Sequence, residues 1–380
     1  MVKTNKFRIL IYSDHFFPSV GGSENYAMDL ATELSRQGHT VGLITSEKTT
    51  EPDKFPFRVY RLSKPLSLHK INFNFLEIPH IIKIFEPHVF HISYQGGGEN
   101  LLIPILKAMK IPIVLTYHAD HVVTLGKIVD ELQIISTFKL VNMILVQSNR
   151  DMKKMKSRGI SQKRLRLENF NGVDTDKYHY SQKILDDNPS CLKLVCIARL
   201  DDGHAYKGID RLLVAALESR YLFDTKKIVL NIIGDGNLRE AYEKFVKSNN
   251  LPNINFLGHL SDDYLIKLLR DSDFLLLPST NKAEGFGRVA LESISCGTPV
   301  IVSKYAGISE LIEKYNSGFV YDPYGIINVF EIANELGKSR SRINGMVQRG
   351  TLMISRECLT LKSTVERTVL CYRELVDEEE

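Results

Sequence analysis

Short runs of apolar residues alternate along the chain with stretches in which apolar residues recur at helical spacing, and this alternation occurs twice. The runs of the first half are FRILIYS, TVGLIT, FRVYRL, HVFHIS, IPIVLTYH and MILVQS. Those of the second half are LKLVCIARL, KIVLNIIG, NINFLGHL, DFLLLPS, TPVIVSKY and SGFVY. Near-continuous apolar runs are typical of strands buried on both faces, and the helices between them require parallel crossovers. The pattern therefore predicts two doubly wound α/β domains.

The chain length agrees with two domains, because 380 residues exceed what one ordinary core holds. A break is predicted within NFNGVDTDKY, residues 169–178, where an Asn-Gly pair and a shift in charge interrupt the pattern. We place the first domain at residues 1–172 and begin the second at residue 173. Ligands of such sheets collect outside the carboxyl ends of the strands. Two sets of strand-end loops therefore predict a cleft between two facing domains.

Composition narrows the class of protein. With 43% hydrophobic and 25% charged residues, the chain is typical of a soluble globular protein, and no apolar run approaches the ~20 residues of a membrane span. The start MVKTNKFRILIYSDHF leads straight into an apolar strand without a signal-peptide pattern. Five cysteines without a CxxC pair indicate reduced thiols and argue against structural zinc. We expect a cytoplasmic protein without a bound metal.

A basic segment, residues 150–166 (RDMKKMKSRGISQKRLR), carries eight Lys or Arg residues against one Asp. Met152, Met155 and Ile160 are interleaved with these charges, a pattern that favours contact with an anionic membrane or with nucleic acid. The alternative interpretation is a solvated helix and loop. We expect no nucleic-acid partner, and we keep peripheral membrane association through 150–166 as a hypothesis.

Several strand-end loops carry groups suited to a phosphate. Gly21 and Gly22 precede a helical pattern, so backbone N–H groups there can meet an anion; the alternative is a turn with Ser23 as the helix N-cap. Arg199 ends LVCIARL and Lys207 begins the next helical pattern, which places two cations at one strand end. The alternative is that Arg199 pairs with Asp201 or Asp202 and that Lys207 is a surface residue.

The stretch NKAEGFGRVALE, residues 281–292, brackets a Gly-Phe-Gly turn with two carboxylates, Glu284 and Glu292. A helix is predicted to begin near Gly287, and its first N–H groups carry partial positive charge. Glu292 lies four positions after Arg288, one turn further along the helix, where it can accept hydrogen bonds from hydroxyls beside an anion. The arrangement predicts an elongated ligand with a phosphate centre and hydroxyls at each end, which describes a nucleotide sugar.

Other chemistries lack support. No GxGxxG turn occurs, GDGNLRE lacks the third glycine, and QGGGEN lacks the Lys-Ser/Thr of a P-loop. No GxSxG or papain-like cysteine context is present. His118 ends the most apolar strand of the first half, where a histidine is more often structural than catalytic. Asp120 and His121 follow it, but no third ligand has metal spacing.

Taken in order, the motifs resemble the retaining enzymes of glycosyltransferase family 4, which have the GT-B fold. The family hallmark is Glu, seven residues, Glu, in the form EGFGxxxLE, matched by Glu284 and Glu292. FFPSVGGSE, LTYHAD, NGVDTDKY, ARLDDGHAYKGIDRLL, IIGDGNLRE, FLGHLSDDYLIKLLRDSDFLLLPS and CGTPVIVSKYAGISELI also fit in order, over residues 7–325. The resemblance implies that the last helical stretch returns to the first domain. The expected domains are therefore 1–172 with 366–380, and 173–365.

The resemblance also implies roles for individual residues. Arg199 and Lys207 would bind the donor diphosphate, which Gly21 and Gly22 would approach from the first domain. Glu292 would bind the ribose, Glu284 would lie by the transferred sugar, and His118 would touch that sugar. The backbone of Gly285, Phe286, Gly287, Arg288 and Val289 would meet phosphate and sugar, and Gly258, His259 and Leu260 would lie by the base. One departure is DDGHAY, which makes the loop before Lys207 longer than the commonest form.

The expected reaction is transfer of a hexosyl unit from a nucleoside diphosphate to an acceptor hydroxyl, with retention of configuration and without a cofactor or metal. The acceptor would be a glycan, a lipid-linked hydroxyl or a small molecule. Three alternatives share the same residues: a nucleotide-sugar epimerase, a sugar phosphorylase, and a non-catalytic nucleotide-sugar-binding protein. Neither the base nor the sugar of the donor follows from the sequence.

Overall fold

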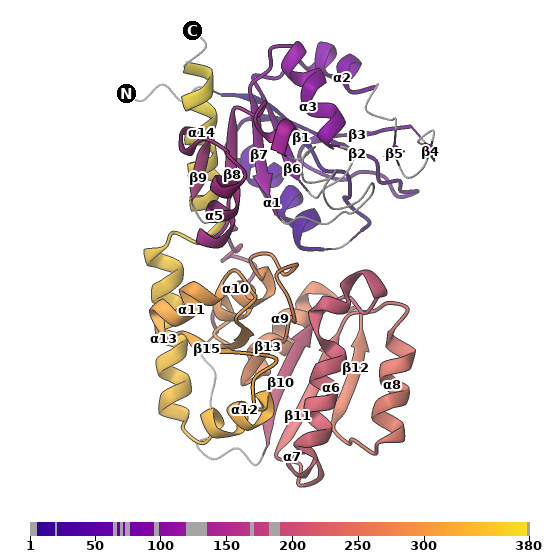
Figure 1. The fold of residues 1–380 in the computed structure, drawn as a ribbon, viewed down its shortest axis with the longest axis vertical. Coiled ribbons are helices and arrows are strands. Elements are labelled where there is room, and N and C mark those ends of the chain that lie inside the picture. Colours follow the sequence, from indigo (N-terminus) through magenta and orange to yellow (C-terminus); the bar gives the residue numbers. More distant parts are fainter. Residues whose placement is uncertain are drawn as a thin grey trace. The chain divides into compact units, whose positions relative to one another are not determined.

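The structure is a computed structural model that describes residues 6–19, 21–63, 67–68, 71–72, 77–94, 99–118, 135–167, 171–181 and 191–377. The chain forms two compact units, Met1–Gly172 with Leu361–Glu380 and Val173–Thr360. Each unit alternates helices with parallel strands (Figure 1). The predicted fold class, two doubly wound α/β domains, is confirmed. The glycines of QGGGEN, with Asp120 and His121, lie outside the described residues.

The first unit is built on a parallel sheet of seven strands in the order β3-β2-β1-β6-β7-β8-β9. Its strands are β1 (Arg8–Tyr12), β2 (Thr40–Thr45), β3 (Arg58–Arg61), β6 (Val89–Tyr94), β7 (Ile113–Tyr117), β8 (Met143–Val146) and β9 (Leu165–Leu167). A two-stranded antiparallel pair adds β4 (Ser67–Leu68) and β5 (Ile71–Asn72). The helices are α1 (Gly22–Arg36), α2 (Ile78–Phe85), α3 (Glu99–Ala108), α5 (Asn149–Ser157), the 3-10 helix η2 (Gln162–Arg164) and α14 (Leu361–Asp377).

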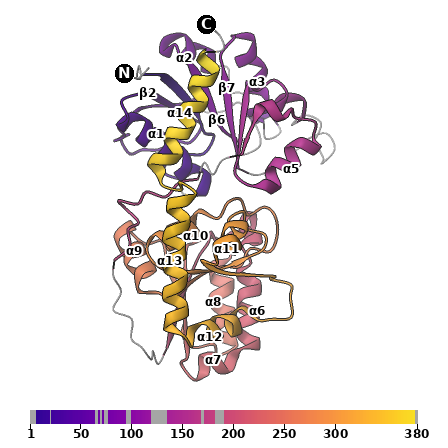
Figure 2. The same ribbon diagram turned by 90° about the vertical axis from the view of Figure 1, so that its left-hand side faces the viewer.

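Both faces of this sheet are buried, as continuous apolar strands predict. Leu10 of β1 packs with α2, α3 and α5, whereas Ile9 and Ile11 face α1 and α14. Helix α14, from the carboxyl end of the chain, therefore completes the core of the unit that contains the amino end (Figure 2). It begins at Leu361, ahead of the segment 366–380 that was expected to return.

The basic segment 150–166 forms α5, η2 and β9. Met152, Met155 and Ile160 are 6%, 0% and 4% exposed and belong to the core of the unit. The apolar residues between the charges are thus core residues of an amphipathic element, and they are not available to enter a membrane. The sequence pattern did not predict strand β9, because this strand has only three residues and is flanked by charged residues. In the described part of the chain, no helix is long and apolar enough to cross a membrane.

A buried hydrogen-bonded network connects α14 to the sheet. His91 on β6 is 0% exposed, and its Nδ1 lies 2.5 Å from the Tyr372 hydroxyl of α14. Its Nε2 lies 2.8 Å from Thr116 Oγ1 on β7, which in turn lies 2.9 Å from the Tyr26 hydroxyl of α1. Burial lowers the pKa of His91 from 6.5 to about 3, so the imidazole is neutral in the folded protein.

We expect His91 to make the folded protein sensitive to acid. Since its folded pKa lies below its unfolded pKa, the unfolded chain binds the extra proton, and stability falls as pH drops from about 6.5 towards 3. This group should cost about 2 kcal/mol of unfolding free energy between pH 7 and pH 5. Urea unfolding of the wild type and of His91→Gln at both pH values checks this. Equal pH-dependent losses in the two proteins would contradict it.

The second unit is built on a parallel sheet of six strands in the order β12-β11-β10-β13-β14-β15. Its strands are β10 (Leu192–Ile197), β11 (Ile228–Ile233), β12 (Ile254–Gly258), β13 (Phe274–Leu277), β14 (Val300–Ser303) and β15 (Gly318–Tyr321). Its helices are η3 (Asp202–Lys207, a 3-10 helix), α6 (Ile209–Glu218), α7 (Arg220–Asp224), α8 (Arg239–Ser248), α9 (Asp262–Asp271), α10 (Arg288–Ser295), α11 (Ser309–Tyr315), α12 (Val329–Gly337) and α13 (Arg340–Arg356).

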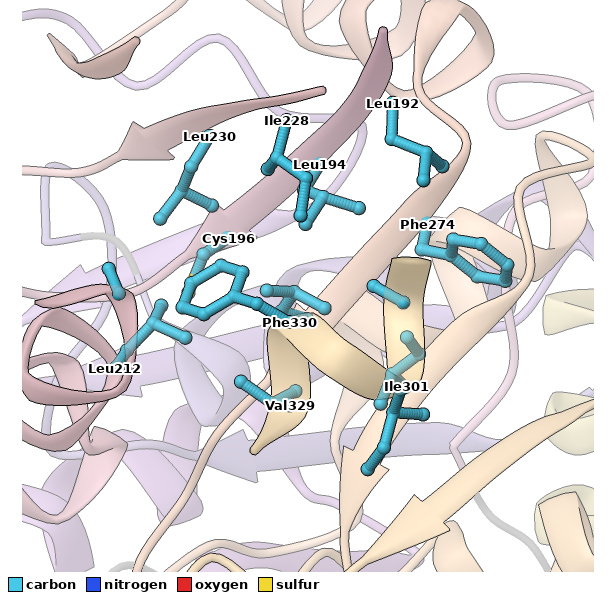
Figure 3. Packing of buried hydrophobic residues seen from close by; sticks show 14 of the residues in the cluster. Leu192, Leu194, Cys196, Leu212, Ile228, Leu230, Phe274, Ile301, Val329 and Phe330 are labelled. Atoms are coloured by element: carbon cyan, nitrogen blue, oxygen red, sulfur yellow. The ribbon is translucent and has the colours of Figure 1, made fainter. Parts of the chain in front are cut away.

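This sheet is also covered on both faces. Leu194 and Cys196 of β10 pack with α6, α7 and α12, and Figure 3 shows Phe330 of α12 among the side chains of this cluster. Val195 faces the opposite way, towards the cluster that holds α9, α10 and α11. Every apolar run identified from the sequence contains one of the strands β1–β3, β6–β8 and β10–β15. Because both faces of the sheet are buried, these strands appear in the sequence as continuous apolar runs.

Candidate functional site

The second sheet has its topological switch point between β10 and β13. Strand β10 pairs with β11 on one side and with β13 on the other, so the crossovers leave it in opposite directions. The loops after β10 and β13 are joined where Thr280 N–H donates to Tyr206 O at 2.8 Å. Gly208 has φ +75°, and a Cβ there would lie 2.2 Å from Pro278 O. This edge of the sheet is where open α/β folds bind ligands.

Lys207 and Glu284 form an ion pair at this switch point. Lys207 Nζ donates to Glu284 Oε2 at 2.8 Å, and Ser279 Oγ donates to the same oxygen at 2.6 Å. The two charged side chains are 19% and 5% exposed. Burial alone would lower the pKa of Lys207. The charge of Glu284 and its hydrogen bond raise this pKa by more than burial lowers it, so the net shift is upward. The Lys207 ammonium is therefore charged at neutral pH.

Arg199 lies two residues beyond β10 and pairs with Asp201, with Nε 3.4 Å from Oδ2. Its side chain is 45% exposed, whereas Asp201 is 29% exposed. The sequence offered Asp201 and Asp202 as partners of Arg199, and the structure contains the pair with Asp201. Lys207 is not the surface residue of the alternative interpretation, because it is largely buried against Glu284.

The helix start predicted near Gly287 is confirmed. Gly287 is the N-cap of α10, with φ +91°, and no side chain caps the helix. The turn before it is fixed from the next loop, because Gly307 N–H and Ile308 N–H donate to Gly285 O and Phe286 O, each at 2.8 Å. The Phe286 side chain is 5% exposed and packs in the core. The backbone of this turn is thus held rigid at an uncapped helix N-terminus.

Glu292 lies one turn into α10 and is 8% exposed. Arg288 lies on the same face, with its Nε 3.9 Å from Glu292 Oε1. Val289, between them, is partly buried against the hydrophobic cluster under α10. The like charges of Glu284 and Glu292 are therefore each matched by a cation, Lys207 and Arg288.

The stretch 258–260 begins with the last residue of β12 and lies at the carboxyl edge of the same sheet. Gly258 has φ +66°, and its carbonyl accepts the N–H of Gly234, which follows β11, at 2.9 Å. His259 is exposed and Leu260 packs against the core. Strand β12 is separated from β10 by β11, so this loop lies to one side of the switch point.

In the first unit, His118 follows β7 and is held through both ring nitrogens. Nδ1 lies 3.0 Å from the Gln147 amide Nε2, and Nε2 lies 3.0 Å from Ser93 Oγ. Because an amide NH2 group only donates, Nδ1 is the acceptor and the neutral ring carries its proton on Nε2. The Tyr26 ring packs edge-on against it, with centroids 4.8 Å apart. The ring orientation is thus fixed by β6, β7 and α1, together with the residue after β8.

Gly21 is the N-cap of α1, and no side chain caps this helix, so the alternative of a Ser23 cap is wrong. Ser23 Oγ instead donates to Glu24 Oε2 at 2.9 Å. The Glu24 carboxylate folds back over Gly21, where a Cβ would lie 2.4 Å from Oε2. At Gly22 a Cβ would meet no heavy atom of the described residues within 4 Å, so among these residues nothing covers the backbone at this helix start.

Sequence reasoning missed Ser279 and His204. Ser279 lies two residues after the end of β13 and is 0% exposed, and a serine close to a strand end was the one available signal. His204 Nδ1 lies 2.7 Å from Asp201 Oδ1 inside the long loop before Lys207. Among the described residues, no group of three His, Cys, Asp or Glu side chains has the arrangement of a metal site.

Two family descriptions match consecutive parts of the chain. Glycosyltransferase Family 4 matches residues 20–177, and Glycosyl transferases group 1 matches residues 187–349. An uncharacterized glycosyltransferase of Methanocaldococcus jannaschii is 31% identical over 45% of this chain and 45% of its own length. The sulfoquinovosyl transferase SQD2 of Arabidopsis thaliana is 25% identical over 81% of this chain and 62% of its own. The matched region thus spans about half of these relatives.

Solved structures share the fold. Sucrose-phosphate synthase from Thermosynechococcus elongatus has a TM-score of 0.81 at 18% identity, covering 97% of this chain and 99% of that one. Anabaena HepE, solved in complex with UDP-glucose, has a TM-score of 0.77 at 16% identity, covering 97% and 99%. The architecture is therefore that of the two-domain GT-B proteins. Within that class, the chain belongs to the glycosyltransferases described as Family 4 and group 1, whose models together match residues 20–177 and 187–349.

Proposed function

We propose that the protein is a retaining glycosyltransferase that moves a hexosyl unit from a nucleoside-diphosphate sugar to an acceptor hydroxyl. The observation that carries this proposal is the Lys207–Glu284 ion pair, at 2.8 Å, placed at the switch point with Arg199 and the uncapped start of α10. The matches to group 1 glycosyltransferases and the fold shared with a UDP-glucose complex support it.

The diphosphate gains charge as the glycosidic bond breaks, and this unit can stabilise that charge. Lys207 has three N–H donors, so it can keep its bond to Glu284 and still donate to a phosphate oxygen. The Arg199 fork and the first N–H groups of α10 add further donors. Stabilisation of a developing anion by fixed donors is a large catalytic effect. In this proposal no metal or other cofactor is required.

The transferred sugar becomes oxocarbenium-like, as in glycoside hydrolysis. Glu284 would orient the sugar and support its positive charge, and His118 would contact it. Because Glu284 Oε2 already accepts from Lys207 and Ser279, its negative charge is stabilised and its nucleophilicity lowered. This favours electrostatic support over a covalent intermediate. Retention would then come from the departing phosphate, which takes the acceptor proton on the same face. Glu292 would bind the ribose, and residues 258–260 would lie by the base.

A donor-hydrolysis screen across UDP-, GDP- and ADP-sugars tests the proposal, with the anomeric configuration of each product read by NMR. We expect one base to be preferred and the anomeric configuration to be retained. Inverted product would overturn the retaining assignment. Formation of a new epimer when only the donor is present would favour the epimerase alternative over sugar transfer. Absence of turnover with every donor and acceptor, despite nucleotide-sugar binding, would favour a non-catalytic protein.

We also propose that the first unit associates peripherally with an anionic membrane at its cytoplasmic face, where a lipid-linked acceptor would be reached. A hollow of about 470 Å³ is lined by Lys139, Gly159, Ile160, Ser161, Lys163 and Arg164, at the amino ends of β8 and β9. No ion pair to a described carboxylate involves its two lysines. Because the apolar residues of the segment are buried, the attraction would be electrostatic and sensitive to salt.

The double variant Lys139→Glu/Lys163→Glu should therefore bind vesicles of phosphatidylglycerol at least about 30-fold more weakly, since each lost lysine removes roughly 1 kcal/mol. Cosedimentation measures this, and Lys244→Glu/Lys267→Glu in the other unit makes the same change in net charge as a control. Equal binding by the two double variants, or wild-type binding that survives high salt, would rule out the basic hollow as the membrane contact.

A further inference from the structure

The loop between β10 and Lys207 contains a carboxylate shared by two partners. Asp201 Oδ2 lies 3.4 Å from Arg199 Nε, while Oδ1 lies 2.7 Å from His204 Nδ1. The His204 side chain is 26% exposed, and its ring is tilted against Tyr206 with centroids 5.8 Å apart. Asp201 and His204 both lie in the loop that connects β10 with Lys207.

The loop is held in place from the β11 side, which makes this geometry specific. Asn237 Nδ2 donates to Asp202 Oδ2 at 2.6 Å, and Asp202 N–H donates to Asn237 Oδ1 at 3.2 Å. Leu200 N–H donates to Asp235 O at 2.9 Å. The backbone that carries Asp201 is thus tied at both ends of the turn, and Asp201 has little freedom to leave its two partners.

We propose that His204 is a positioning residue for the donor diphosphate: by holding Asp201, it sets how strongly Asp201 competes with the diphosphate for Arg199. This inference rests on the proposed function, in which Arg199 binds the diphosphate. A protonated His204 balances the charge of Asp201 and adds a positive charge near the phosphates. A neutral His204 keeps its hydrogen bond but leaves the carboxylate charge to act on the guanidinium.

The loop that carries His204 contains Arg199, Asp201, Asp202, Tyr206 and Lys207, and the segment after β11 that is bonded to it contains Asp235 and Arg239. Most of them have other partners. Lys207 pairs with Glu284, Asp235 with Arg239 at 2.9 Å, and Asp202 accepts from an amide. Burial raises the pKa of Tyr206, so its hydroxyl stays neutral near pH 7.

The pKa of Asp201 supports the shared geometry. Burial would raise it, but the hydrogen bond and charge of His204, with the charge of Arg199, bring it below its ordinary value. The carboxylate is therefore ionised throughout the range of about pH 5 to 8 in which histidines change charge. The Asp201 carboxylate therefore keeps its charge for both Arg199 and His204 over that range.

Donor binding should consequently weaken as pH rises. The probes are UDP-glucose and GDP-mannose, whose diphosphate diesters keep a constant charge between pH 6 and 8, with binding measured by calorimetry. We expect the dissociation constant of the probe that binds to rise three- to tenfold from pH 6 to pH 8. His204→Gln should bind the probe weakly at every pH, with a dissociation constant near that of the wild type at pH 8. Asp201→Asn should bind it tightly at every pH, with a dissociation constant near that of the wild type at pH 6. A merely disturbed loop would weaken binding in both variants.

Two comparisons keep the inference separate from the proposed function. His179→Gln, at an exposed histidine outside the site, should keep the wild-type profile. If Arg199→Ala binds both probes as tightly as the wild type, the diphosphate role of Arg199 fails and this inference fails with it. If Arg199→Ala weakens binding but His204→Gln keeps the wild-type pH profile, the diphosphate site stands and only the role of His204 is overturned.

Discussion

Lys207→Ala should lower kcat/KM for sugar transfer by about 10²- to 10³-fold, the loss typical of removing one fixed donor to a developing anion. The ammonium is held within 2.8 Å of Glu284 and largely shielded from water, so its position does not have to be created during the reaction. Its removal takes away a charge next to the leaving diphosphate. It also leaves Glu284 buried without its cation, which raises the cost of keeping that carboxylate ionised.

The same substitution should destabilise the second unit, because breaking a buried ion pair costs roughly 3–5 kcal/mol. Rates are therefore compared only at temperatures where circular dichroism shows the variant folded. Glu284→Gln keeps the shape of the side chain and can still accept from Ser279, so it separates the loss of charge from the loss of packing. It too should reduce transfer strongly.

Lys304→Ala is the matched control, since Lys304 forms an exposed ion pair with Asp322 at 2.5 Å in the same unit. It should leave both activity and stability near the wild-type values. Near-wild-type turnover in folded Lys207→Ala or Glu284→Gln would remove these residues from the proposed mechanism. A double variant of the pair that loses no more activity than either single variant would show that the two residues act as one unit.

The sequence indicates the loops of this site but not how they meet. The apolar runs predicted the strands, and the Gly-Phe-Gly turn predicted the start of α10. The pair of Lys207 and Glu284, in contrast, joins residues 77 positions apart. It exists because β13 lies beside β10, and the order of strands in a sheet cannot be read from apolar periodicity. The sequence therefore predicted that Lys207 is a diphosphate ligand or a surface residue and that Glu284 is a site residue, but it did not predict that the two side chains pair.

The first unit gives a second example of the same limit. His91 lies inside HVFHIS, where a histidine among apolar residues predicts a buried strand position but no partner. Its hydrogen bond reaches Tyr372, 281 positions later, because α14 packs on the sheet of the unit that holds the amino end. The basic segment shows this limit in another way, because the sequence did not predict that its apolar residues are buried. Its charges suggested a surface, whereas burial of Met152 and Met155 depends on which face of α5 meets the sheet.

Glu292→Gln should weaken donor binding about 10- to 100-fold while changing kcat little. The carboxylate is 8% exposed, and Arg288 on the same helical face holds it at 3.9 Å. A carboxylate that accepts from ribose hydroxyls makes charge-assisted hydrogen bonds, each worth about 1.5–3 kcal/mol. These bonds are present in both the ground state and the transition state, so their loss raises the dissociation constant and leaves the chemical step unchanged.

Deoxyribose analogues of the donor identify the bonded group. The wild type should lose affinity for the 2′-deoxy or the 3′-deoxy nucleotide sugar, whereas Glu292→Gln should show little further loss for the same analogue. Glu335→Gln, at an exposed glutamate paired with Lys338 in the same unit, is the control and should bind all donors as the wild type does. Unchanged affinity in Glu292→Gln, measured by calorimetry, would refute the ribose role. Additive losses would show that Glu292 acts on the donor indirectly, through Arg288.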